Sequence, residues 1–100
     1  MIRHVVMWKF KNEAEGKSKL ENMAIVRDQL YALLPIIPEI KRMEIGMDVK
    51  GTDASMDLML LTEFDTLETL KIYADHPAHV NVASYVRKVT ESRVVLDCEI

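Results

Sequence analysis

Two of the three histidines in the chain and one of its three tyrosines fall within seven residues, the segment 73–79 with the sequence YADHPAH. The segments on both sides of it are predicted helices, so this segment forms a corner between them. His79 falls in the first turn of the second helix, where the helix dipole disfavours a positive charge and keeps the imidazole neutral near pH 7. A neutral imidazole can accept a proton, so any chemistry in this protein is expected at this corner.

The same residues also suit a corner that is purely structural. Asp75 or His76 can cap the second helix, and Pro77 fits its first position, where a missing backbone donor costs nothing. The imidazoles of His76 and His79 can both hydrogen-bond backbone groups. A reactive corner and a structural corner are therefore both open from the residues alone.

The size and composition of the chain restrict the classes of function. One hundred residues predict one domain, over residues 1–100, and a hydrophobic content of 49% is enough for a folded core. The formal net charge is −3 and the basic residues form no run, which excludes nucleic acid as the main partner. The N-terminal residues predict neither a signal peptide nor a membrane span. Cys98 is the only cysteine, so no internal disulfide is expected and a cytoplasmic location is predicted.

The first third of the chain predicts a strand followed by a helix. Residues 2–10 alternate with a period of two, and both faces of this strand carry apolar residues. A polar loop follows at residues 12–17, after which Ser18 and Glu21 fit a capping box. Pro35 and Pro38 end the helix, because neither can donate the backbone hydrogen bond that continuation requires. The residues that recur at helical spacing are Leu20, Met23, Ala24, Arg27, Leu30, Tyr31 and Leu34.

The rest of the chain predicts three more strands and a helical region divided at the corner. The strands are expected at residues 40–48, 57–64 and 93–98, and a polar turn joins the first two. Asp65 and Glu68 signal the start of a short helix that ends near the corner. The order β, α, β, β, α, β predicts an α+β, ferredoxin-like split βαβ fold. In this fold a four-stranded antiparallel sheet carries its helices on one face.

This fold leaves one face of the sheet uncovered. The first and third predicted strands are apolar on both faces, whereas the helices cover only one. A chain of 100 residues has no further segment to cover the second face. A second copy of the chain, packed through the same face, is the expected cover, and this predicts a homodimer.

His4 shares a strand face with Val6 and Trp8. This face is the more apolar one and is therefore assigned to the helix side of the sheet. Tyr73 ends the helix before the corner and His79 begins the next one. His4, Tyr73 and His79 are therefore expected to border one cavity between the sheet and the helices.

Four stretches of the sequence resemble the stress-responsive A/B barrel (Dabb) domain, and the resemblance covers nearly the whole chain. They are residues 2–11 (IRHVVMWKFK), 63–65 (EFD), Tyr73 with 76–79 (HPAH), and 94–97 (VVLD). The resemblance implies a ferredoxin-like protomer whose sheets pair into a dimeric α+β barrel. It implies no single activity.

The sequence is also similar to polyketide cyclases of this family, which need no cofactor. That similarity implies that His79 is a general base that removes a proton from a carbon between two carbonyls. It implies that Tyr73 holds the enolate oxygen and that His4 belongs to the same site. A small apolar or carbonyl-containing ligand is therefore expected, with no cofactor. The alternative is a stress-related dimer without catalysis, in which the same groups are packed and internally hydrogen-bonded.

Two other kinds of site are rivals. A metal site would use the imidazoles of His4, His76 and His79, although a three-residue spacing across a proline corner need not point both rings inward. A cation held by backbone carbonyls near the prolines after the first helix would leave no side-chain signature. Oxygen or haem chemistry near Trp8 follows only from analogy with other proteins of this architecture, and Trp8 suits the core of the first strand.

Overall fold

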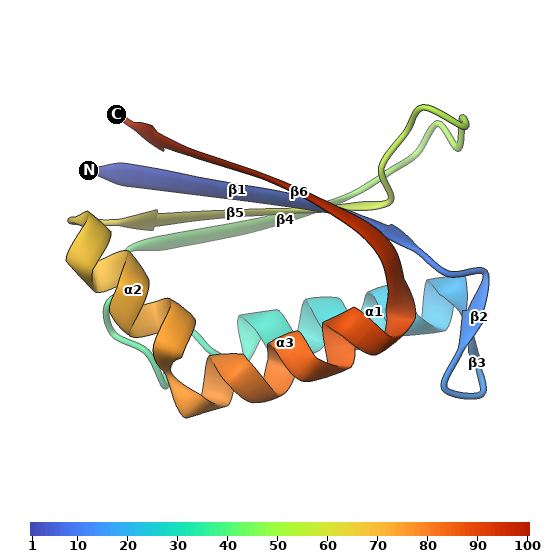
Figure 1. The fold of residues 1–100 in the computed structure, drawn as a ribbon, viewed down its shortest axis with the longest axis horizontal. Coiled ribbons are helices and arrows are strands. Elements are labelled where there is room, and N and C mark those ends of the chain that lie inside the picture. Colours follow the sequence, from blue (N-terminus) through green and yellow to red (C-terminus); the bar gives the residue numbers. More distant parts are fainter.

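The computed structural model describes residues 1–100 as a four-stranded sheet with a layer of helices beneath it (Figure 1). The strands pair antiparallel in the order β4-β5-β1-β6, which is the order of a ferredoxin-like sheet. The predicted α+β fold is therefore confirmed. The elements are β1 (Ile2–Phe10), β2 (Glu13–Ala14), β3 (Lys17–Ser18), α1 (Lys19–Tyr31), β4 (Arg42–Met47), β5 (Leu58–Phe64), α2 (Leu67–Asp75), α3 (Pro77–Val89) and β6 (Thr90–Glu99).

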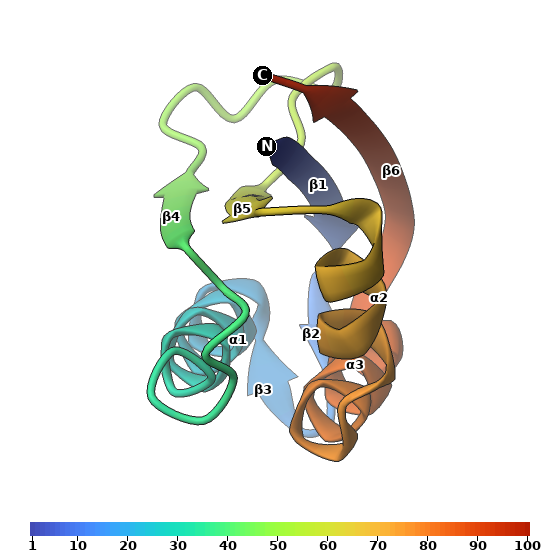
Figure 2. The same ribbon diagram turned by 90° about the vertical axis from the view of Figure 1, so that its left-hand side faces the viewer.

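The core lies between the sheet and the helices. Alternation along β1 turns Val6, Trp8 and Phe10 toward the helices, where all three are buried. Val6 lies opposite Leu60 of β5, which is also buried. Figure 2 shows all three helices on one side of the sheet, as predicted. None of these helices is both long and apolar enough to cross a membrane.

The first helix ends earlier than the prolines predicted. α1 ends at Tyr31, and the amide groups of Leu33 and Leu34 then bond to carbonyls three residues back. Bonds of this kind tighten the last turn of a helix. Pro35 lies four residues after Tyr31 and cannot donate to the Tyr31 carbonyl, so it blocks continuation of the helix as predicted.

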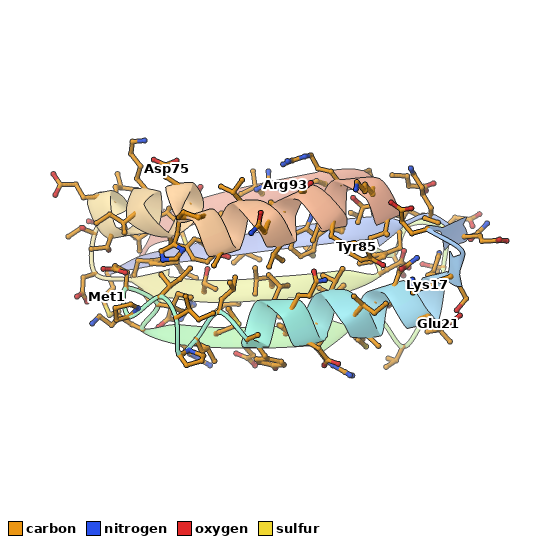
Figure 3. The ribbon with its side chains drawn as sticks, turned by 90° about the horizontal axis from the view of Figure 1, so that it is seen from below. Met1, Lys17, Glu21, Asp75, Tyr85 and Arg93 are labelled. Atoms are coloured by element: carbon orange, nitrogen blue, oxygen red, sulfur yellow. The ribbon has the colours of Figure 1, made fainter.

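The buried face of α1 agrees with the predicted one only in part, since Met23 and Leu30 are buried as predicted. Leu20 is 74% exposed and Tyr31 is 40% exposed, whereas Val26 is fully buried. Asn22 is fully buried as well, because its side-chain amide donates to the Ala14 carbonyl and accepts from the Tyr85 hydroxyl. Figure 3 shows Tyr85 between α3 and α1. Apolar residues occur around the whole circumference of α1, so spacing alone could not identify the face that packs.

Residues 12–17, predicted as a polar loop, contain a two-residue hairpin. β2 and β3 pair around Glu15 and Gly16, which have φ angles of 53° and 71°. Positive φ at both central positions is the mark of a type I′ turn, and glycine adopts it without strain. The hairpin carries the Ala14 carbonyl to Asn22, and so it anchors the start of α1.

The helix caps agree with prediction in two of three places. The Ser18–Glu21 capping box is present, and His76 caps α3 ahead of Pro77. The cap of α2 is Thr66 paired with Thr69, and not Asp65 with Glu68 as predicted. The two threonine hydroxyls satisfy each other's backbone amides, so α2 begins one residue later than the aspartate suggested.

The face of the sheet away from the helices carries an apolar band. Alternation and strand register place Val5 beside Leu61 and Leu96 on this outer face, and Met7 beside Met59 and Val94. Leu96 is 62% exposed in the single chain and Val94 is 48% exposed. The outer band is defined as Val5, Met7, Met59, Leu61, Val94 and Leu96.

Candidate functional site

A cavity of about 750 Å³ lies between the sheet and the α2–α3 pair. Its walls come from β1 and β6 on one side and from α2 and α3 on the other, an arrangement that can be followed in Figure 2. Ten of its eighteen lining residues are hydrophobic, so it suits a largely apolar ligand. His4, Tyr73 and His79 all line it, and the fold thus brings the three candidate residues together.

Tyr73 is buried to 1% exposure, and its hydroxyl has no hydrogen-bond partner. Its ring packs against Phe64, with ring centres 5.0 Å apart, and against His79, with ring centres 4.3 Å apart. Burial raises the pKa of the Tyr73 hydroxyl to about 12, and the positive charge of Arg93 opposes this rise. The hydroxyl therefore stays protonated near neutral pH and has a hydrogen bond to donate.

His79 has one ring nitrogen committed and one free. Its Nδ1 lies 3.0 Å from the carbonyl oxygen of Ala74, so this nitrogen carries the proton and donates it. Burial lowers the pKa of His79; the bond to Ala74 opposes this, and the charges of His4, Arg93 and Arg87 lower the pKa further. The ring is therefore a neutral imidazole whose Nε2 can take up a proton.

His4 is held by a carboxylate that the sequence did not single out. Its Nδ1 pairs with Oδ1 of Asp97, the residue directly opposite it in the β1–β6 register. Both residues line the cavity. Alternation in the last strand places Asp97 and Arg93 on the same face, and this was the available signal for their role. The pairing fixes the ring of His4 at one end of the cavity.

The other two predicted site residues have different surroundings. Trp8 lines the cavity but is also a core residue, only 6% exposed. His76 does not line it, and its Nδ1 accepts the backbone amide proton of Ala78 at 3.1 Å. The two histidines of the corner are thus separated, one capping α3 and the other facing the cavity. No three His, Cys, Asp or Glu side chains are grouped as a metal-binding set would require.

We expect Tyr73→Phe to raise the free energy of unfolding by about 1 kcal/mol, because it removes a buried polar atom that has no partner. Tyr85→Phe is the matched control. The Tyr85 hydroxyl donates to Asn22 Oδ1 at 2.7 Å, so its loss should lower the free energy of unfolding by about 1–2 kcal/mol. Urea unfolding followed by circular dichroism measures both. A destabilised Tyr73→Phe protein would show that the hydroxyl has a partner inside the fold.

Comparison with known proteins places the chain among proteins of this architecture. The model of the stress-responsive A/B barrel domain matches residues 2–100. Olivetolic acid cyclase from Cannabis sativa is 29% identical over 98 residues, which cover 96% of this chain and 93% of that protein. A dimeric protein of unknown function from Bacteroides fragilis, with a ferredoxin-like fold, is 29% identical with a TM-score of 0.87; the match covers 99% of this chain and 95% of that one.

A dimeric ferredoxin-like protein of unknown function from Thermobifida fusca has a TM-score of 0.84 at 21% identity, with 99% of this chain and 90% of that chain covered. At this identity the likeness concerns the fold alone, and it agrees with the observed strand order. The family model, by contrast, spans the strands, the corner and the cavity in one match. The chain therefore belongs to the stress-responsive A/B barrel family.

Proposed function

We propose that this protein binds a small, largely apolar molecule through a carbonyl group in the cavity between the sheet and α2–α3. One observation carries the proposal. The Tyr73 hydroxyl is buried, protonated and unpartnered, and it lies beside the neutral imidazole of His79. A buried donor without a partner is costly, and a ligand oxygen would satisfy it.

The same pair of groups suits proton transfer next to that carbonyl. His79 Nε2 removes a proton from the carbon beside the carbonyl, and the electron pair of the broken C–H bond moves onto the oxygen as an enolate. Tyr73 donates a hydrogen bond to this oxygen as its negative charge develops. The enolate carbon can then attack a second carbonyl of the same molecule. The π electrons of that carbonyl move onto its oxygen, which takes the proton back from His79 Nε2, and this is the ring-closing step of a cyclase. A relative with 29% identity bears the name olivetolic acid cyclase.

The working unit we propose is a homodimer that buries the outer band. The band is an apolar surface on the face of the sheet that the helices leave uncovered. Surfaces of this kind are typical of self-complementary interfaces. The relative from Bacteroides fragilis, at 29% identity, is dimeric. The cytoplasmic location stays a prediction from the composition.

Binding of a ketone and of its hydrocarbon isostere tests the cavity. Acetophenone and α-methylstyrene have nearly the same shape, but only the ketone accepts a hydrogen bond. We expect Tyr73→Phe to weaken acetophenone binding about tenfold and to leave α-methylstyrene binding unchanged, since only the ketone loses a bond. Dissociation constants from NMR shift changes of the cavity residues give both values.

Comparing acetophenone with α-methylstyrene also distinguishes a ligand-binding protein from an interaction dimer without a ligand. Equal losses for both compounds would show that Tyr73 acts through packing and not through its hydroxyl. If neither compound binds, and the cavity side chains are packed together and hydrogen-bonded to one another, a stress-related interaction dimer without a ligand is favoured.

A further inference from the structure

Two arginines border the cavity without any protein partner. Arg87 and Arg93 both line it, and neither takes part in an ion pair or a side-chain hydrogen bond of the fold. The other three arginines do pair: Arg3, Arg27 and Arg42 all contact carboxylates. The unpaired cations of α3 and β6 thus gather at the cavity.

Strand register fixes where Arg93 lies. It is opposite Trp8 in the β1–β6 pair, whereas Asp97 is opposite His4. Both residues of β6 therefore lie on the face that looks toward the helices, and a distance of about 13 Å along the strand separates them. Figure 3, seen from the helix side, labels Arg93 beside α3. Arg93 thus stands at one end of the cavity, with the His4–Asp97 pair at the other.

The two arginines have different structural surroundings. Arg87 is in the last turn of α3, where the helix dipole favours a positive charge. Arg93 lies in the edge strand β6, away from any helix end, and its side chain is exposed in the single chain. The positive charge of Arg93 acts on the site residues, because it lowers the pKa values of both Tyr73 and His79.

The carboxylates that line the cavity are not paired with its arginines. Two carboxylates line it, Asp97 and Glu91. Asp97 contacts His4 and Glu91 takes part in no ion pair, so neither carboxylate contacts a guanidinium group directly. Both guanidinium groups are therefore free to bind an anionic group of a ligand.

We propose that the ligand of this cavity is a keto acid, whose carboxylate is bound by Arg93 while its ketone is bound by Tyr73. This inference rests on the proposed function and names its substrate class. The planar guanidinium of Arg93 offers two parallel N–H donors, which match the two oxygens of a carboxylate. Arg87 adds positive charge to the same end. The apolar lining between Tyr73 and β6 holds the carbon skeleton.

Matched acids and amides test the proposal. The probes are 4-acetylbenzoate and 6-oxoheptanoate, each compared with its primary amide, which keeps the ketone and the shape but loses the charge. We expect the wild-type protein to bind each acid about tenfold more tightly than its amide in 20 mM salt, and the preference to shrink in 300 mM salt. Calorimetric titration gives the dissociation constants.

Variants that remove one positive charge show which residue causes the tighter binding of acids than of amides. Arg93→Gln should weaken acid binding about tenfold and leave amide binding within a factor of two. Lys88→Gln is the matched control, since it removes one positive charge from an exposed residue next to Arg87 that does not line the cavity. It should change neither affinity. Arg87→Gln should have a smaller effect on the acids than Arg93→Gln.

The possible outcomes are distinguishable. If acids and amides bind equally well, and Arg93→Gln changes neither, the carboxylate subsite is wrong while the ketone site stands. If Lys88→Gln lowers acid binding as much as Arg93→Gln, the preference comes from net charge and the assignment to Arg93 fails. If none of the four ketones binds, both proposals fail together.

Discussion

Replacing His79 with alanine will slow enzyme-dependent proton removal by about 10²- to 10⁴-fold, the usual contribution of a positioned general base. The reaction to follow is deuterium uptake at the carbon between the two carbonyls of a 3-oxohexanoyl thioester in D₂O. NMR measures the loss of the proton signal, and the spontaneous rate without protein is subtracted. His79 is the expected base because its Nδ1 is bound to the Ala74 carbonyl and its Nε2 is left without a proton.

The pH dependence of this rate follows from the state of His79. The base works only when it is unprotonated, so the rate should rise with pH and then level off. Burial lowers the pKa of His79 from 6.5, and the midpoint of the rise should therefore lie below 6.5. A midpoint above this value would mean that a different group limits the rate.

His76→Asn is the matched control for this experiment. Asparagine keeps the ability to cap α3, and His76 does not line the cavity, so the exchange rate should stay near that of the wild type. Full exchange activity in His79→Ala would remove His79 from the mechanism. Equal losses in both variants would mean that the corner matters for its shape alone.

Leu96→Glu will dissociate the proposed dimer, with an increase of at least about 100-fold in the dissociation constant. Leu96 is 62% exposed in the single chain and belongs to the β6 side of the outer band, beside Val5. A dimer that buries this band would bury the new carboxylate without a partner, which costs about 3 kcal/mol or more. Sedimentation across a range of concentrations measures the shift from dimer to monomer.

Leu20→Glu provides the control for this substitution. Leu20 is 74% exposed, but it lies in the first turn of α1 in the helix layer, far from the outer face. Glutamate there suits the helix dipole and should leave the dimer intact. A wild-type chain that sediments as an 11.5 kDa monomer at micromolar concentration would count decisively against the dimer.

The fold could be predicted because local patterns and global packing agree. The alternation in residues 2–10 identified the buried face of β1, and the capping box at Ser18 fixed the start of α1. The face of α1 could not be predicted in the same way. Its choice depends on Asn22, whose two partners come from distant parts of the chain, at Ala14 and Tyr85. Polar contacts of this kind leave no periodic trace in a sequence.

The candidate site was predicted in part. Tyr73, His79 and His4 were named from the corner and from the family resemblance, and the fold brings them to one cavity. Asp97 and Arg93 were not named, because their place depends on the β1–β6 register, which pairs residues more than 80 positions apart. The lack of a partner for the Tyr73 hydroxyl depends on every neighbouring atom and is visible only in three dimensions.

The break between α2 and α3 decides which nitrogen of His79 holds its proton. In an unbroken helix the Ala74 carbonyl would accept the backbone amide of Ala78. Here that amide donates to His76 instead, and the Ala74 carbonyl is left to receive the Nδ1 proton of His79. The tautomer is thus set by an interrupted backbone, without the help of an acidic side chain. The corner therefore fixes the tautomer of His79 through a backbone carbonyl. No negatively charged side chain is needed beside His79 to orient its ring.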